Sequence, residues 1–139
     1  MGCDIHIIYE RQAADGTFWP VDMSGYRTGP YLELPFSERS YSLFAFFAGV
    51  RNYSNIKPIA EIRGLPYESH DWKRDRDLHS HSWLSIKELS QFDYDAMLVD
   101  ERCGDVVESY REYLGENFFV ELANCRAAGV DRILFCFDC

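Results

Sequence analysis

Asp4 and His6 are the first residues of the chain whose types and spacing could support chemistry, since they lie two positions apart in the opening stretch MGCDIHIIYE. In a β-strand, alternate side chains point to opposite faces, so this acid and this imidazole share one face. His79 and His81 repeat the spacing in HSHSW. One carboxylate and three imidazoles suit zinc, manganese, iron or nickel. The pattern therefore predicts a metal site formed by Asp4, His6, His79 and His81, with a purely structural role of the histidines as the alternative.

The polar middle of the chain and its surroundings supply acids that a metal site would need for phosphate chemistry. Asp71 and Asp105 are the candidates for a general base or a further ligand. A metal-bound hydroxide would attack a phosphodiester or phosphomonoester, and an arginine would stabilise the charge that develops. The two ligand pairs resemble those of the calcineurin-like metallophosphoesterases. The Gly-Asn-His motif of that family is absent from this chain, so only the chemistry is carried over.

Arginines and aromatic residues in the same part of the chain predict a ligand pocket. Arg51 and Arg63 are candidates to bind phosphate, because a guanidinium can donate two parallel hydrogen bonds to it. Tyr67 and Trp83 are candidates to stack on a base. The alternative is that the aromatic side chains build the core and that the arginines form surface ion pairs.

The composition limits the classes of partner. A net charge of −9 argues against general nucleic-acid binding, which needs a basic surface. No apolar run approaches the length of a membrane span and the N-terminus lacks a signal-peptide pattern, so we expect a cytoplasmic protein without a membrane partner. The cysteines number five, which is odd, and are then expected to be reduced thiols, with Cys136 buried in an apolar strand.

The strand and helix patterns along the sequence predict an α+β fold in one domain spanning residues 1–139. Residues 3–10 and 17–22 are predicted to pair as an antiparallel hairpin, and residues 132–138 form a final apolar strand. We therefore expect a small, mainly antiparallel sheet, built from the N-terminal hairpin and the C-terminal strand and covered by helices. Helices are predicted at 41–52, directly after the capping-box residue Ser85, and over 106–128 with a bend at Gly115.

Several stretches together resemble a set of small uncharacterised proteins from tailed bacteriophages, prophages and some bacteria. The stretches are MGCDIH at the start, RGLP, HSHSWL and FDYD, and the resemblance spans residues 1–95 with an RILF-type strand near the end. The set has no established reaction, so the resemblance implies no catalytic residue. It implies a phage-associated origin and the cytoplasm of a host bacterium.

These patterns leave three functions open. The first is a phage-associated metal-binding protein, such as a metal-dependent phosphoesterase in counter-defence, that acts on a small phosphate-containing, nucleotide-like molecule. The second is a non-catalytic binding protein. It would be a sponge for a nucleotide signal, or an inhibitor of a host defence protein with an exposed apolar or acidic patch and no deep pocket. The third is a structural or assembly protein of the virion, in which the histidine pairs are incidental.

Overall fold

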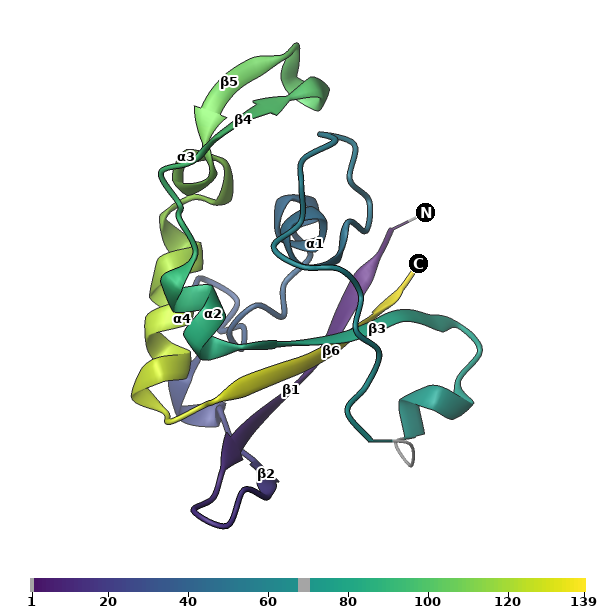
Figure 1. Cartoon of the computed structure of the whole chain (residues 1–139), viewed down its shortest axis with the longest axis vertical. Helices are drawn as coiled ribbons and strands as arrows, with labels where there is room; N and C mark the ends of the chain where they lie inside the picture. The colour runs from purple at the N-terminus through teal and green to yellow at the C-terminus, as the bar shows by residue number, and fades with distance from the viewer. Residues whose placement is uncertain (1, 68–70) are drawn as a thin grey trace.

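A four-stranded antiparallel sheet lies at the centre of the structure, a computed structural model that describes residues 2–67 and 71–139 (Figure 1). Its strand order is β2–β1–β6–β3, and a separate two-stranded sheet pairs β4 with β5. Strands and helices are thus mixed, which confirms the predicted α+β class. The strands are β1 (Asp4–Gln12), β2 (Phe18–Pro20), β3 (Leu78–Ser85), β4 (Met97–Asp100), β5 (Val106–Ser109) and β6 (Arg132–Asp138).

The N-terminal hairpin and the C-terminal strand form as predicted. β1 pairs with β2, with Arg11 opposite Trp19, and its other edge pairs with β6. Every side chain from Ile133 to Phe137 is fully buried. A strand with neighbours on both sides and cover on both faces reads as a continuous apolar run, and β6 has this pattern.

The helices begin where the sequence supplies caps. Ser40 accepts a hydrogen bond from the Leu43 N–H at the start of α1, and Ser85 and Glu88 form the predicted capping box of α2. Glycine at position 49, with a φ of 66°, ends α1 earlier than predicted. The helices are α1 (Tyr41–Ala48), α2 (Ile86–Gln91), α3 (Tyr110–Leu114) and α4 (Glu116–Ala127).

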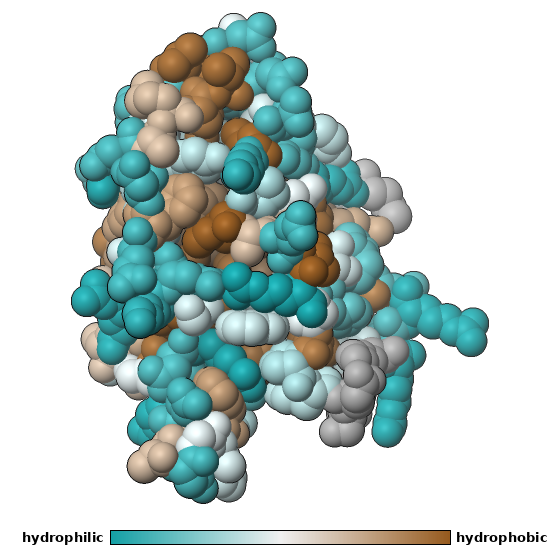
Figure 2. All heavy atoms as spheres, in the orientation of Figure 1, coloured by the Kyte–Doolittle hydropathy of each residue, from teal (hydrophilic) through white to brown (hydrophobic). Residues whose placement is uncertain are grey.

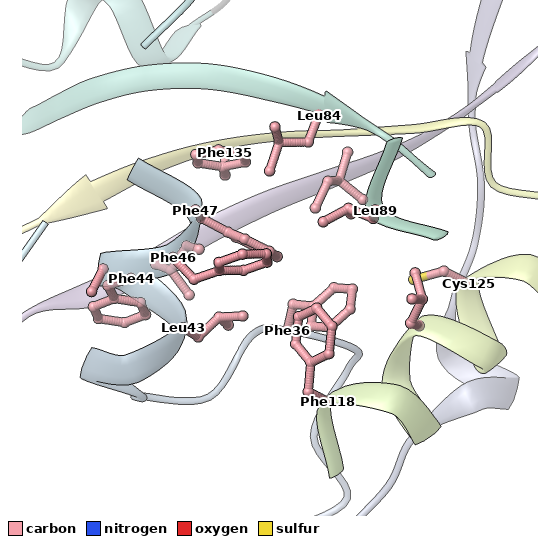
Figure 3. Packing of buried hydrophobic residues seen from close by; sticks show 14 of the residues in the cluster. Phe36, Leu43, Phe44, Phe46, Phe47, Leu84, Leu89, Phe118, Cys125 and Phe135 are labelled. Carbon is pink, nitrogen blue, oxygen red and sulfur yellow. The ribbon is translucent and has the colours of Figure 1, made fainter. Parts of the chain in front are cut away.

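The core lies between α1, α4 and the helix-facing side of the sheet (Figure 3). The ring of Phe47 stacks on Phe135 of β6 with centroids 5.3 Å apart. The ring of Phe46 meets Phe118 of α4 edge-on at 5.8 Å. Edge and stacked pairs of this kind stabilise a core beyond the area they bury. The apolar pattern around α1 is therefore explained by its central position.

Residues 106–128 do not form the single long helix that their periodicity predicts. Val106 to Ser109 form β5, which pairs with β4, and the helix begins only at Tyr110. Ser109 and Glu112 make a second capping box, which fixes this start. Gly115, with a φ of 81°, then separates α3 from α4. The prediction failed because two adjacent valines, which favour strands, happened to continue the helical spacing.

The register of β1 and β6 also corrects the expectation that all cysteines are reduced. Asp4 lies opposite Asp138, so one step further along the ladder Cys3 lies opposite Cys139. The two residues form a disulfide across the strands, with Cα atoms 4.2 Å apart. The expectation of a thiol buried in β6 is confirmed, since Cys136 is free and buried.

Glu121 is a carboxyl group buried in the core, with 6% of its surface exposed. Burial raises its pKa to about 7, although the Phe36 N–H donates to it and lowers the value. The ordinary value is 4.5, so between these two pH values the folded chain binds more protons than the unfolded chain. The free energy of unfolding therefore falls as the pH rises through this window.

We expect Glu121→Gln to raise the free energy of unfolding by about 2 kcal/mol above this pH window and to have little effect below it. The glutamine oxygen can still accept the hydrogen bond from Phe36, while the cost of burying a charge disappears. Urea unfolding on both sides of the window measures the effect. Parallel pH profiles for the variant and the unmodified protein would show that Glu121 does not titrate in this way.

Candidate functional site

β1 presents Asp4 and His6 on the sheet face that points away from the core, as the alternation predicts; both are exposed, and Ile5 between them is buried. Arg39 donates to both oxygens of Asp4, from Nε to Oδ1 and from Nη2 to Oδ2, each at 3.0 Å. His6 Nε2 lies 3.8 Å from Oδ2 of Asp138 on the neighbouring strand. Both residues of the opening motif therefore have local partners at the surface.

A bulge in β3 determines where the two other predicted ligands point. His79 lies opposite Phe137 and Ser82 lies opposite Phe135. Between these pairs, β3 has two residues, at positions 80 and 81, where β6 has only one, at position 136. The residue before His81 has a positive φ of 56°. His79 is thus on the face of Phe137, and His81, directly before Ser82, is on the other. The prediction that the two histidines share a face is wrong for this reason.

The predicted metal ligands lie on two strands that flank β6. Asp4 and His6 are on β1, while His79 and His81 are on β3. In the described part of the chain, no group of three or more His, Cys, Asp or Glu side chains is placed to hold a metal ion. The four-ligand site, with zinc, manganese, iron or nickel, stays a prediction.

The two predicted catalytic acids belong to other segments. Asp105 is exposed in the turn that leads into β5, outside the sheet that carries Asp4 and His6. Asp71 begins a short 3₁₀ helix, and its side chain lies outside the described residues. The role of these acids as a general base stays a prediction.

Two of the predicted ligand-binding residues meet at β3, and a third lies against β1. The guanidinium of Arg63 lies 4.6 Å from the ring centroid of Trp83 and donates to Glu88, with Nη1 2.7 Å from Oε1. The Tyr67 hydroxyl donates to Oε2 of Glu10 at 3.4 Å. These side chains thus have protein partners at the sheet, and their role in binding a ligand stays a prediction.

Arg132 connects these contacts into one cluster. Its Nε donates to Glu10 Oε1 at 2.7 Å, and its guanidinium lies 3.4 Å from the ring centroid of Phe18 and 6.0 Å from that of Trp83. Arg51, the fourth predicted ligand residue, lies apart from these contacts and donates to a neighbouring tyrosine hydroxyl. Glu88 and Glu10 neutralise the two guanidiniums of the cluster. This arrangement is therefore better suited to packing over the sheet than to binding a phosphate.

An open hollow of about 600 Å³ runs along residues 57–62 and the end of α1. Its lining is mainly apolar, with Pro58, Ile59 and Ile62 among the contributors. None of the four predicted ligand-binding residues lines it. The nucleotide pocket built from those residues stays a prediction.

An exposed apolar surface on the β4–β5 hairpin was not predicted from the sequence. Met97 and Val99 alternate on one face of β4, and Val107 lies opposite Val99 on β5. Their exposed fractions are 60%, 47% and 62%, while Leu98 and Asp100 on the other face are buried. We call Met97, Val99 and Val107 the hairpin face. Figure 2 shows brown, apolar spheres at the top of the view, where Figure 1 places β4 and β5.

Several contacts hold the hairpin in place. The Glu101 N–H donates to the Ser54 carbonyl at 3.2 Å, and Asn55 donates to the Glu101 carboxylate. The Ser54 hydroxyl lowers the pKa of the buried Asp100 carboxyl, which stays charged and hydrogen-bonded. At the other end of the hairpin, the Tyr110 N–H donates to the Ala96 carbonyl, just before β4, at 3.0 Å. The hairpin face is thus presented by a braced element, which lowers the ordering cost of binding.

The surroundings of the hairpin face are acidic. Residues 93–108 contain six carboxylates and one arginine, Arg102. Asp105 and Glu101 are exposed beside the strands. An apolar centre with a charged rim is the usual composition of a protein–protein interface.

No protein-family model, curated protein or solved structure matches this chain. Among the described residues, no helix has the length and apolar character needed to cross a membrane.

Proposed function

We propose that this chain is a non-catalytic binding protein that docks on a partner protein through the hairpin face. The observation that carries the proposal is the exposure of Met97, Val99 and Val107 together on one braced hairpin. Contiguous exposed apolar side chains cost solvation free energy, and they commonly mark a surface that another protein covers. This is the exposed patch expected of an inhibitor of a host protein.

Charge specifies the partner. The carboxylates around the hairpin face favour an apolar patch rimmed by lysine or arginine, because opposite charges steer association and fix orientation. A second copy of the chain is a poor occupant: a symmetric dimer would bring this acidic rim against itself, and each copy carries a net charge of −9. The proposal therefore commits to a different, basic partner. Its location in the cytoplasm of a bacterial host remains part of the proposal.

We expect Val107→Asp to weaken partner binding by about 100-fold, because the substitution buries an unpaired carboxylate in the apolar centre of the contact. Val120→Asp is the matched control, since Val120 is 50% exposed on α4, outside the hairpin. The unmodified protein is used to capture a partner from a lysate of a candidate host, and the captured protein is then purified. Titration calorimetry with all three forms gives the affinities.

The proposal requires that the purified partner binds the unmodified protein and the Val120→Asp variant equally. Equal binding by Val107→Asp would contradict it, and so would the absence of any captured protein that still binds after purification. Circular dichroism establishes that each variant is folded before the comparison.

The metal-dependent phosphoesterase is the second proposal, favoured by the exposure of Asp4 and His6 beside Asp138. Elemental analysis of protein purified without a histidine-rich tag tests it, with His79→Ala/His81→Ala as the comparison. Near-stoichiometric zinc, manganese, iron or nickel that is lost in the variant would support it. A metal-free unmodified protein would remove it.

A further inference from the structure

We propose that the partner contributes an extended segment that pairs with the outer edge of β5 and adds a third strand to the hairpin. This inference rests on the proposed docking function and names the form in which the partner is recognised. Strand addition draws its affinity from main-chain hydrogen bonds and its specificity from alternate side chains.

The two edges of the hairpin have different surroundings. β4 leads directly into Glu101, whose N–H bonds to Ser54, so its end lies against the loop that follows α1. β5 lies on the side of the hairpin away from α1 (Figure 1). In the described residues the hairpin is a two-stranded sheet, and no further strand pairs with β5. Its outer backbone groups are therefore in position to accept another strand.

The edge lacks three of the features that usually prevent such pairing, although β5 has only four residues and carries one charge, at Glu108. Natural edge strands carry lysine or proline, or contain a bulge that twists the edge away. Residues 97–109 contain neither lysine nor proline, and β4 and β5 pair in an uninterrupted register from Met97 with Ser109 to Asp100 with Val106. Val106 and Val107 are β-branched and 47% and 62% exposed. Such residues favour an extended neighbour.

The side chains on β5 define the sequence of the added strand. An aliphatic residue opposite Val107 would extend the hairpin face, whereas the next residue would lie opposite Glu108 on the other face. Asp105 precedes the strand, at a φ of 61°, and adds to the negative charge beside this edge. The recognised segment therefore alternates aliphatic and basic residues. Pairing of two β5 edges from two copies would instead bring together two acidic segments, each with Asp105 and Glu108, which disfavours self-association.

The probe is an acetylated, amidated hexapeptide of alternating lysine and valine. In an extended strand, the N–H groups of its valines point to one edge and those of its lysines to the other. Two analogues, N-methylated at every valine or at every lysine, each remove the donors of one edge and keep all side chains. NMR titration gives the affinities, and hydrogen exchange reports on the amides of residues 106–108.

We expect one methylated analogue to bind at least 10-fold more weakly than the parent peptide, while the other binds like the parent. Replacing the lysines by glutamates is expected to abolish binding, and the parent peptide is expected to slow exchange in β5. Equal behaviour of both analogues, unchanged exchange in β5, or no binding at millimolar peptide would overturn strand addition.

The two proposals fail in different ways. If Val107→Asp weakens binding of the purified partner but the two methylated peptides bind equally well, docking through the hairpin face is supported and strand addition is contradicted. If neither partner nor peptide distinguishes Val107→Asp from Val120→Asp, both fall.

Discussion

Replacing Cys139 with serine is expected to lower the free energy of unfolding by about 4 kcal/mol. The disulfide to Cys3 joins residues 136 positions apart, so it restrains nearly the whole unfolded chain. In the chain-entropy account, the loss on removing such a cross-link grows with the length of the closed loop. Cys139 is exposed, so the serine hydroxyl meets solvent and the substitution tests the cross-link itself.

Denaturant unfolding with and without a reductant measures this effect. The unmodified protein is expected to lose the same stability when a dithiol reduces the disulfide, and the Cys139→Ser variant is expected to be insensitive to reductant. Cys103→Ser is the control, because Cys103 is an exposed free thiol and its replacement should change little. Identical unfolding curves of the unmodified protein in both conditions would show that the cross-link does not stabilise the fold.

Local patterns were sufficient to predict the elements that depend on local interactions. The alternation in β1 correctly separated Asp4 and His6 from the buried Ile5, and the Ser85 capping box correctly marked the start of α2. Alternation and capping are properties of a few consecutive residues, which a single sequence displays directly. The α+β class followed from such signals at the two ends of the chain.

The β4–β5 hairpin was missed because its signals were ambiguous. Val106 and Val107 fit the helical spacing that continues to Cys125, and the capping box at Ser109 that starts the helix was overlooked. The short apolar run from Met97 to Val99, followed a few residues later by Gly-Asp at 104–105, was the available signal for a hairpin. Short apolar runs do not distinguish strand from helix by periodicity alone.

The candidate site was less predictable because its geometry depends on pairing between distant segments. The partners of Asp4 and His6 are Arg39 and Asp138, which only the fold brings near. The bulge that turns His79 and His81 to opposite faces follows from the register between β3 and β6, and a single sequence does not fix a register. The contacts that Arg63 and Tyr67 make with Glu88, Trp83 and Glu10 were not predicted.

The contact between Glu10 and Arg132 is expected to give the second large effect on stability. Glu10 is 4% exposed, and its Oε1 lies 2.7 Å from Arg132 Nε. Arg132→Met is expected to lower the free energy of unfolding by about 4 kcal/mol, because it leaves a buried carboxylate without its counter-charge. Glu10→Leu combined with Arg132→Met is expected to stay within about 1 kcal/mol of the unmodified protein, since it removes both charges. Urea unfolding of the four members of this cycle provides the measurement.

Arg39→Met supplies the comparison for an exposed pair, because Arg39 binds Asp4 with both side chains about half exposed. Solvent and salt weaken such a pair, so its loss is expected to cost less than about 1 kcal/mol. A cost for Arg132→Met no larger than that for Arg39→Met would contradict the buried-charge argument. A double variant as unstable as Arg132→Met alone would instead assign the loss to the packing of the Arg132 guanidinium on Phe18, 3.4 Å from its ring centroid. Arg132→Met and the double variant together therefore separate the contribution of charge to stability from that of packing around Arg132.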